Sequence, residues 1–537
     1  MPSYQAMGQR YEVTLHPLTE TPEGAEVPAA AFAAKATHAR RGVTPRHAAR
    51  IDGNAIVGAV ASSSVLRTRV SHASRLAVVQ GAAPSRAIAG SRRPAATAMS
   101  TATTTCFATE TIIVEGMRQA DIAAAKNYGA TVIAEGLDGK TLIRVDSVER
   151  VFGLVNLLLE RQVGSATPNF IRQVSAPRPS GPAAAWSHAK MRVAEAWAVT
   201  RGSGDVHVAV LDEGVDTSHP SLKRAVVAQR DFIGDKGDSA MPDGNDAHGT
   251  ACAGVILSRD GTYPGIAPQC GLIAARIAMG DSQRNWIFDD FATADAIDWC
   301  WRQGAAVLSN SWTGGAPSDA ISRAFARART QGRNGLGAVI AIAAGNDQGP
   351  VQFPGDLPGY VTVGASNPAD QRKTRTSSDG EDWWGSCFGA TLQLLAPGVF
   401  IWTTDIAGPA GYSTGDFTKT FNGTSSATPA VAGAAALMIS ANPAISASSV
   451  RELLGKTAKK IARQKTWTKE LGWGRLDVAA AVTAAASAGK ETAAPKTPKT
   501  TKTPKKTKKT KTSAKKKKTT NKTATKKKGA STRRRSK

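Results

Sequence analysis

Long apolar runs are missing from this sequence of 537 residues. A helix that crosses a membrane needs about 18 or more consecutive apolar residues, and the longest runs here, residues 427–439 and 478–486, are shorter. We therefore expect no transmembrane segment. The first 30 residues also lack the basic and then apolar order of a secretory signal and carry four glutamates, which argues against export.

Cysteine is scarce as well. The five cysteines are scattered without C-x-x-C spacing, and their number is odd; they are Cys106, Cys252, Cys270, Cys300 and Cys387. Structural zinc sites and complete disulfide frameworks need closely spaced cysteines or an even number of them, so neither is expected. Reduced thiols in a cytoplasmic protein fit this pattern better.

Acidic residues are nearly absent from two segments. Asp52 is the only acid from residue 27 to residue 107. The apolar residues there show no sustained period, so residues 1–107 are expected to be a poorly structured extension. In the second segment, Lys490–Lys537, 18 Lys, three Arg and one Glu supply 20 of the 26 net positive charges of the chain.

This C-terminal segment has no apolar residues able to form a core, and its like charges repel one another. We therefore expect residues 489–537 to be a disordered Lys-rich tail. Such a tail can bind nucleic acid without sequence preference, through phosphate neutralisation. Another polyanion, an anionic membrane surface and a purely solubilising role are the alternatives.

Residues 108–176, between these segments, have the pattern of a small domain. The predicted elements are a strand at residues 111–116, a helix at 118–129 and two strands within 130–145. Asp138-Gly139 between those two strands is typical of a tight hairpin turn. A second helix follows, with its apolar residues on one face; they are Val148, Val151, Phe152, Val155, Leu158 and Leu159. A last strand within 165–174 completes the βαββαβ order of a ferredoxin-like α+β domain.

Residues 177–185 are rich in Pro, Gly and Ala and are expected to be an exposed linker. In residues 186–488, near-continuous apolar strands alternate with helices, which indicates an α/β domain whose parallel sheet is covered on both faces. The expected strands are residues 206–212, 271–277, 305–311, 338–345 and 360–366, and the expected helices include 288–304 and 319–332. In such folds functional residues tend to lie at the carboxyl ends of strands.

Three residues of this domain have a setting that suits catalysis. Asp212 ends the first strand, and His248 stands in DAHGTACAGVI before a run of small residues. Ser425 opens a helix-like, Ala-rich run. Each has an ordinary structural alternative, because an acid can cap a turn and because Ser425 or Ser426, taken alone, is more simply explained as a helix N-cap.

The combination of the three is more specific than any one of them. Nucleophilic catalysis needs a hydroxyl that attacks, an imidazole that moves its proton and a carboxylate that orients the imidazole. VAVLDEGVD, HGTACAG and NGTSSATPAVAG, which contain Asp212, His248 and Ser425, closely resemble the three active-site segments of the subtilisin-like serine proteases, the subtilase family. The resemblance extends over residues 185–488. It implies a subtilisin-like fold and a serine endopeptidase that acts through an acyl-enzyme, without a cofactor for the chemistry.

The resemblance also implies roles for individual residues. Ser425 would be the nucleophile, His248 the base and Asp212 the group that orients it. Ser426 occupies a position that the family leaves variable. Asn346, in AIAAGNDQG, would supply the side-chain donor of the oxyanion hole, and the Ser425 backbone N–H the second donor. Substrate contacts are expected in and near LSNSWTGG, which resembles the strand that pairs with an extended peptide, at Ser311, Trp312 and Gly345.

Many subtilases carry an N-terminal ferredoxin-like prodomain that assists folding and then blocks the cleft. Residues 108–176 resemble such an inhibitor-like prodomain, and cleavage is expected within residues 173–185. An unrelated small domain is the alternative. Polypeptide substrates and the chain's own prodomain are then the expected partners, beside nucleic acid or another polyanion at Lys490–Lys537.

Two residues depart from the usual family pattern. Glu213 stands where the family has a small or polar residue or Asp. Cys252 matches a minority pattern with a thiol below the histidine, and simple core packing explains it as well. Structural calcium is compatible with the acidic loops, but no EF-hand spacing places it. The alternative function is a catalytically inactive protease fold that binds nucleic acid; the presence of all three triad residues and of Asn346 argues against it.

Overall fold

A computed structural model of the chain describes residues 2–16, 63, 66, 75–81, 104–175, 186–280 and 285–488. Residues Met1–Gly489 form one unit and Lys490–Lys537 a second. The predicted linker at 177–185 and the predicted tail at 489–537 lie outside the described residues. In the described part of the chain, no helix is long and apolar enough to cross a membrane.

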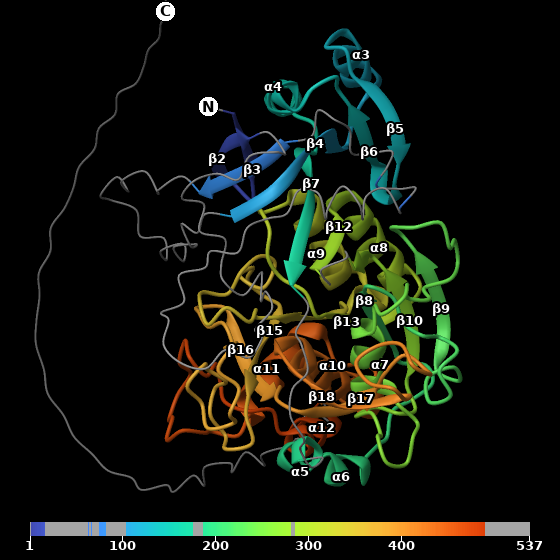
Figure 1. Cartoon of the computed structure of the whole chain (residues 1–537), viewed down its shortest axis with the longest axis vertical. Coiled ribbons are helices and arrows are strands. Elements are labelled where there is room, and N and C mark those ends of the chain that lie inside the picture. Colours follow the sequence, from blue (N-terminus) through green and yellow to red (C-terminus); the bar gives the residue numbers. More distant parts are fainter. Residues whose placement is uncertain are drawn as a thin grey trace, which may run out of the picture. The chain divides into compact units, whose positions relative to one another are not determined.

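A parallel sheet of seven strands forms the centre of residues 186–488 (Figure 1). Its order is β16-β15-β14-β13-β8-β10-β9, and all neighbouring strands are parallel. The strands are β8 (His207–Asp212), β9 (Val226–Asp231), β10 (Gly271–Arg276), β13 (Ala305–Asn310), β14 (Val339–Ala343), β15 (Val361–Ser366) and β16 (Leu392–Pro397). The five predicted strands are confirmed. The two missed strands, β9 and β16, are the edges of the sheet, and both contain polar residues that interrupt the apolar pattern.

Helices cover both faces of this sheet, as predicted. Along β10, Leu272 and Ala274 pack into one core cluster, and Ile273 and Ala275 pack into another, because successive side chains of a strand point to opposite faces. The first cluster contains residues of α6 (Val193–Trp197), α7 (His248–Leu257), α10 (Thr424–Ala441), α11 (Ala447–Thr457) and α12 (Val478–Ser487). The second contains residues of α8 (Asp290–Arg302) and α9 (Asp319–Gln331). Smaller elements are α5 (Trp186–Met191), η2 (Arg333–Gly335), and the paired strands β17 (Ile401–Thr404) and β18 (Phe417–Phe421).

The predicted βαββαβ order of the ferredoxin-like unit, which we define as residues 104–175, is confirmed. Its elements are β4 (Thr104–Glu115), α3 (Gln119–Asn127), β5 (Thr131–Glu135), η1 (Leu137–Gly139), β6 (Lys140–Arg144), α4 (Val148–Glu160) and β7 (Ser165–Ser175). Asp138 and Gly139 have φ of 59° and 69°, as the predicted hairpin turn requires. Helix α4 buries the predicted face except Leu159, which is only partly buried, and it buries Leu154 in addition.

The prediction that residues 1–107 are poorly structured is wrong for the part of them that the structure describes. β1 (Ser3–Ala6), β2 (Gln9–His16) and β3 (Arg75–Gly81) add to the ferredoxin-like unit in the order β1-β2-β3-β4-β7. Tyr11 and Val13 are buried, whereas Glu12 and Thr14, which alternate with them, are exposed. This alternation is short. β2 pairs on one side with the adjacent β1 and on the other with β3, about 60 residues away, so its place in the larger sheet depends on a distant segment.

The ferredoxin-like unit and the α/β part share one sheet. β7 pairs antiparallel with β12 (Asn285–Asp289), which pairs with β11 (Ala278–Gly280). Figure 1 shows α8 and α9 between this sheet and the central parallel sheet. The two regions predicted as separate domains therefore belong to one unit, because a continuous hydrogen-bonded ladder joins them.

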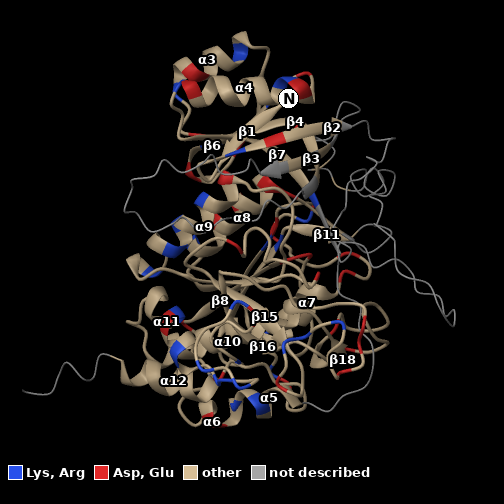
Figure 2. Cartoon of the chain, turned by 90° about the vertical axis from the view of Figure 1, so that its left-hand side faces the viewer, with Lys and Arg blue, Asp and Glu red and all other residues tan. Residues whose placement is uncertain are grey.

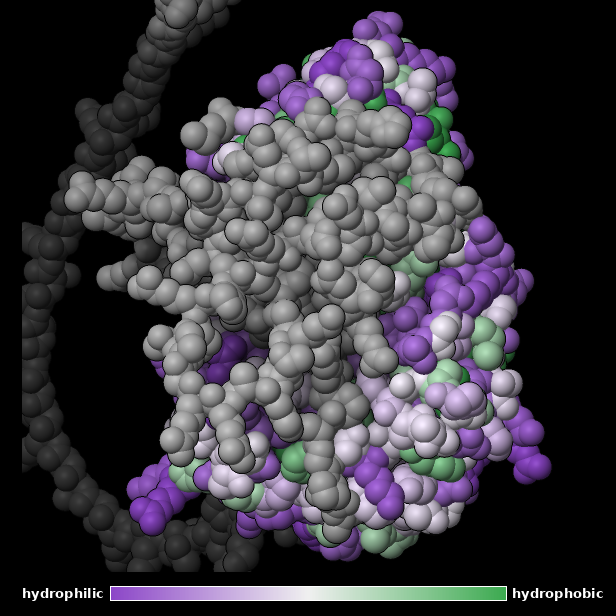
Figure 3. All heavy atoms as spheres, in the orientation of Figure 1, coloured by the Kyte–Doolittle hydropathy of each residue, from purple (hydrophilic) through white to green (hydrophobic). Residues whose placement is uncertain are grey.

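Charged side chains also join these two regions. The side chains of Lys140 and Asp298 are fully buried and form an ion pair, and Glu115 pairs with Arg323 and Arg327 of α9. Figure 2 shows charged residues along α9 and on neighbouring strands. Large exposed apolar side chains are few on the described residues, namely Val132, Val199, Val227 and Trp473, and apolar residues lie scattered over the described surface in Figure 3.

Candidate active site

Asp212 and His248 lie together at the carboxyl edge of the parallel sheet. Asp212 is the last residue of β8, and His248 is the first residue of α7. Nδ1 of His248 lies 3.0 Å from Oδ1 and 3.2 Å from Oδ2 of Asp212. Both side chains are buried. Gly249 allows this approach, since a Cβ there would lie 2.0 Å from the carbonyl oxygen of Gly214.

Ser425 is presented by the start of helix α10. This helix begins at Thr424, after Gly423 with φ 109°, so the backbone N–H of Ser425 lies in the first turn, where N–H groups have no intrahelical acceptor. Helix α10 thus starts three residues earlier than the predicted apolar run. The hydroxyl of Ser426 donates a hydrogen bond to the carbonyl oxygen of Gly423 at 2.9 Å, so it is used within the helix start.

The hydroxyl of Ser425 faces Ser311 in this structure. It donates to the carbonyl oxygen of Ser311 at 3.0 Å, and the Ser311 hydroxyl donates to the carbonyl oxygen of Ser425, also at 3.0 Å. Nε2 of His248 is buried and has no hydrogen-bond partner among the described residues. The hydrogen bond between serine and histidine is therefore not formed here, as is common for catalytic contacts in the absence of substrate.

Cys252 links the histidine to the serine. Its Sγ lies 3.6 Å from Nδ1 of His248 and 3.5 Å from the carbonyl oxygen of Ser425. Burial, together with the nearby Asp212 carboxylate, raises the pKa of the Cys252 thiol well above its usual value. The thiol therefore stays protonated and is a poor nucleophile. The ligand atoms of Asp212, His248 and Cys252 lie within 4.8 Å of one another and form the only metal-ligand-like group found in the described residues.

Asn346 is held in an orientation that suits an oxyanion donor. Its Oδ1 accepts the backbone N–H of Thr424 at 2.8 Å and the Thr424 hydroxyl at 3.0 Å. The amide oxygen is thus engaged, which leaves the NH₂ group to point elsewhere. Gly345 donates its N–H to Oγ1 of Thr424 at 3.2 Å. Thr424 therefore couples the β14 loop to the start of α10. Thr424 lies inside the Ser425 segment, but its place in the sequence alone predicts no such role for it.

Two of the predicted substrate-binding residues have additional structural contacts. Ser311 bonds to Ser425, as described above. The side chain of Trp312 is buried in the core with α9, where its ring lies 6.1 Å from that of Phe325 and 5.4 Å from that of Phe288. Only the backbone of Trp312 remains a candidate for pairing with a peptide. Gly345 has φ 106°, and a Cβ there would lie 3.1 Å from Sγ of Cys387.

Two aromatic rings pack against His248, and neither contact was predicted from the sequence. Trp286 of β12 meets the imidazole edge-on with ring centroids 4.4 Å apart, and Phe421 of β18 lies 5.3 Å away. Their distances from His248 along the chain leave no local signal for this contact. Because Trp286 also stands opposite Val174 in the pairing of β12 with β7, the ferredoxin-like unit ends beside His248.

Glu213 is buried next to the Asp–His pair. Its Oε1 accepts the backbone N–H of His248 at 2.8 Å. Burial, followed by the nearby charges of Asp246 and Asp212, raises the pKa of Glu213 well above its usual value. Asp246 is itself raised to a pKa of about 6 by burial. The Glu213 carboxyl group therefore holds a proton more firmly in the folded chain than in the unfolded chain.

The substitution Glu213→Gln is expected to make folding stability less sensitive to a rise in pH above the ordinary pKa of 4.5. Between the ordinary pKa of 4.5 and the raised value, the folded wild type binds more protons than the unfolded chain, so its stability falls as the pH rises through this window. Glutamine cannot ionise and keeps an oxygen for the His248 N–H. Thermal unfolding of both chains from about pH 5 to about pH 9 measures the difference. The exposed Glu195, changed to Gln, is the control; equal pH profiles for Glu213→Gln and the wild type would contradict the argument.

Known proteins show which family the chain resembles. A model of the subtilase family matches residues 203–474, just over half of the chain. Subtilisin DY from Bacillus licheniformis is 33% identical over 264 residues, which cover 48% of this chain and 85% of that protein. Thermitase from Thermoactinomyces vulgaris is 31% identical over 285 residues, which cover 52% of this chain and 90% of thermitase.

A calcium-dependent protease from a Nostoc species is 30% identical over 348 residues, which cover 56% of this chain and 50% of the relative. The chain thus spans about half the length of that relative. Among solved structures, fervidolysin from Fervidobacterium pennivorans, a keratinolytic enzyme related to subtilisin, superimposes with a TM-score of 0.55 at 21% identity and covers 70% of this chain and 61% of fervidolysin. This likeness shows the fold. Because the family model spans all three active-site segments and half of the sequence, the chain belongs to the subtilase family.

Proposed function

We propose that the chain is a serine endopeptidase in which Ser425 is the nucleophile. The observation that carries this proposal is the short contact between Nδ1 of His248 and Asp212, which turns the unpartnered Nε2 away from the carboxylate. The carboxylate fixes the imidazole tautomer, so Nε2 can accept the serine proton as the hydroxyl attacks a peptide carbonyl. Nε2 then returns this proton to the leaving amine, and water releases the acyl group by the same path.

The oxyanion of the tetrahedral intermediate needs preorganised donors. Asn346 and the backbone N–H of Ser425 are the donors we propose, because Thr424 holds the Asn346 amide beside the start of α10. Backbone groups at Ser311, Trp312 and Gly345 would pair with an extended polypeptide substrate. No step of this chemistry requires a cofactor.

The test is direct. The purified chain should cleave an unfolded protein, and a fluorophosphonate should label it on the tryptic peptide that carries Ser425, as read by mass spectrometry. Absence of both cleavage and labelling would reject the proposal in favour of an inactive protease fold.

We propose further that the chain is made as a zymogen whose prodomain is the ferredoxin-like unit. Its last strand, β7, pairs with β12, and β12 carries the Trp286 that contacts His248. Arg172 of β7 is fully buried and forms an ion pair with Asp290 of α8. It also donates to the carbonyl oxygens of Gly314 at 2.7 Å and Ala316 at 2.5 Å. Cleavage within residues 173–185 would follow directly after this anchor.

Replacing Arg172 with Ala should destabilise this association by about 3–5 kcal/mol, because the Asp290 carboxylate would stay buried without its partner. The substitution Ser425→Ala prevents self-cleavage and serves as the background. We expect the double variant Arg172→Ala/Ser425→Ala to have a lower urea midpoint of unfolding than Ser425→Ala alone. Arg150→Ala, which breaks an exposed ion pair of the same unit with Asp146, is the matched control. Equal midpoints for all three chains would show that Arg172 is no anchor.

Three further expectations stay proposals. The tail Lys490–Lys537 would bind nucleic acid or another polyanion, and its deletion should abolish DNA retention at low salt. A reducing, cytoplasmic location is supported by five buried cysteines that all carry free thiols. Structural calcium is suggested by the name of the Nostoc relative, and we assign it no site.

A further inference from the structure

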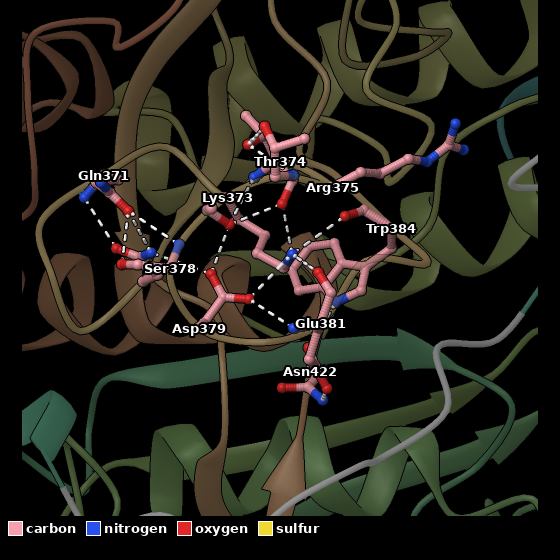
Figure 4. Close-up of polar contacts among 12 residues, drawn as sticks. Gln371, Lys373, Thr374, Arg375, Ser378, Asp379, Glu381, Trp384 and Asn422 are labelled. Carbon is pink, nitrogen blue, oxygen red and sulfur yellow. Dashed lines mark hydrogen bonds and ion pairs between the residues drawn. The ribbon is translucent and has the colours of Figure 1, made fainter. Parts of the chain in front are cut away.

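Lys373 is fully buried near the start of α10, the helix that carries Ser425. The ammonium group of Lys373 donates to the carbonyl oxygens of Thr374 at 2.6 Å, Glu381 at 2.5 Å and Trp384 at 3.2 Å. It lies 3.1 Å from Oδ1 of Asp379, and both side chains are completely buried. We call these four oxygens and the ammonium group the Lys373 cage; Figure 4 shows them converging on Nζ.

The composition of the cage is that of a cation site. An ammonium group has three N–H donors, and three carbonyl oxygens accept them here. The single carboxylate balances the charge, as a buried cation requires. Carbonyl and carboxylate oxygens are also the ligands that hard metal ions take. In this chain a covalently attached ammonium fills the space, so the loop from Lys373 to Trp384 is gathered around a cation without any metal.

The carboxylate of the cage is itself fixed. Asp379 accepts the Ser377 hydroxyl at 2.5 Å and the Asn367 amide at 3.0 Å. Burial acts to raise the pKa of Asp379, but these hydrogen bonds and Lys373 outweigh burial and lower it. The carboxylate thus stays charged opposite the ammonium group.

The cage connects to the nucleophile through Glu381. Its backbone carbonyl accepts from Lys373, and its side-chain Oε1 accepts the Nδ2–H of Asn422 at 2.8 Å. Oε2 accepts the indole N–H of Trp384 at 2.7 Å. Asn422 in turn accepts the backbone N–H of Phe400 through Oδ1 at 2.6 Å. Asn422 is buried and directly precedes Gly423, the N-cap of α10.

We propose that Lys373 and Glu381 are positioning residues for Ser425. The ammonium group replaces a bound cation in ordering the loop, and Glu381 transmits this order to the turn of Asn422 and Gly423, which sets where the first turn of α10 begins. The proposal rests on the proposed function of Ser425 as the nucleophile. Neither residue touches the reacting atoms, so each acts through the backbone of the turn.

The first experiment removes the ammonium group and then supplies it from solution. In Lys373→Ala, the rate of fluorophosphonate labelling of Ser425 should fall by about 10²-fold, the cost of a displacement of about 1 Å at a catalytic group. Propylammonium, which matches the atoms removed, should restore both the labelling rate and the melting temperature, whereas tetramethylammonium, which has no N–H donors, should not. Lys456→Ala, which removes an exposed lysine of α11, is the control and should behave as the wild type.

The second experiment removes the hydrogen bond between the Glu381 side chain and Asn422 and leaves the Lys373 cage in place. It tests the proposal even if Lys373→Ala does not fold. Glu381→Ala should lower kcat with little change in KM, after correction for folded enzyme, and Glu381→Gln should lie between it and the wild type because it keeps one acceptor oxygen. In both Lys373→Ala and Glu381→Ala, hydrogen exchange of the peptide that contains Gly423 to Ser425 should accelerate.

The outcomes are distinguishable. No labelling of the wild type would reject the proposed function, and the exchange measurement would still test the link from the cage to the turn. Wild-type exchange of that peptide in both variants, or a fall in melting temperature with an unchanged kcat of the folded enzyme, would overturn the positioning role. Failure of propylammonium to change either folding or labelling would overturn the role of the ammonium group.

Discussion

Replacing Ser425 with alanine is expected to lower kcat by about 10⁶-fold, a magnitude that comes from subtilisin, a member of the same family, and not from this chain. The reason is that Ser425 supplies the hydroxyl that we propose for the attack, whereas the hydroxyl of the next residue, Ser426, bonds to the carbonyl oxygen of Gly423. The Cys252 thiol does not replace it, because its raised pKa keeps it protonated. The measurement is cleavage of a fluorogenic peptide by wild type and variant purified side by side.

The neighbouring serine is the matched control for this prediction. Ser426→Ala removes a hydroxyl that bonds only to the carbonyl oxygen of Gly423 inside the helix start. We expect its kcat to stay close to that of the wild type. The Ser425→Ala chain should also remain full length during expression if the wild type processes itself. If Ser426→Ala were the inactive variant and Ser425→Ala the active one, the assignment of the nucleophile would be wrong.

Asp212→Asn is expected to lower kcat by about 10⁴-fold, the effect known for the corresponding change in an unrelated serine protease. The carboxylate accepts a hydrogen bond from the Nδ1–H of His248 at 3.0 Å. An asparagine can instead present its NH₂ group, which stabilises the tautomer that carries its proton on Nε2. Such an imidazole cannot take the proton of Ser425.

The pH-rate profile and a control make this second prediction specific. Asp205→Asn changes an exposed acid just before β8 and should leave kcat unchanged. Labelling by fluorophosphonate should fall with kcat in Asp212→Asn while the melting temperature changes far less. An Asp212→Asn enzyme with the wild-type pH profile and rate would show that Asp212 does not orient the base.

Much of the architecture could be predicted because its signals are local. The apolar strands β8, β10, β13, β14 and β15 stand out as short runs between helices, and the Asp138-Gly139 turn marks its own hairpin. Edge strands such as β9 carry polar residues, so the apolar pattern does not predict them. β1 to β3 were missed for another reason: β1 and β2 form a short hairpin, and β3, which joins this hairpin to β4, is far from both of its partners along the chain.

Some residues of the candidate site can likewise be predicted from local motifs, and others cannot. Asp212, His248, Ser425 and Asn346 stand in segments so specific that their types and order suffice to identify them. Trp286 has no such segment, and its contact with His248 depends on how β12 lies between β7 and the active site.

The parallel α/β class, the ferredoxin-like order and the four residues proposed for the chemistry could be read from the sequence, because hydrophobic period and short motifs are properties of neighbours along the chain. The folded chain was needed to see that the ferredoxin-like unit and the α/β part share a sheet, and that Glu381 of the Lys373 loop bonds to Asn422 before Ser425. These contacts join residues from about 40 to more than 100 positions apart. These contacts form because buried polar groups pair with the partners that the folded chain brings near them. No local sequence pattern shows which partners those are.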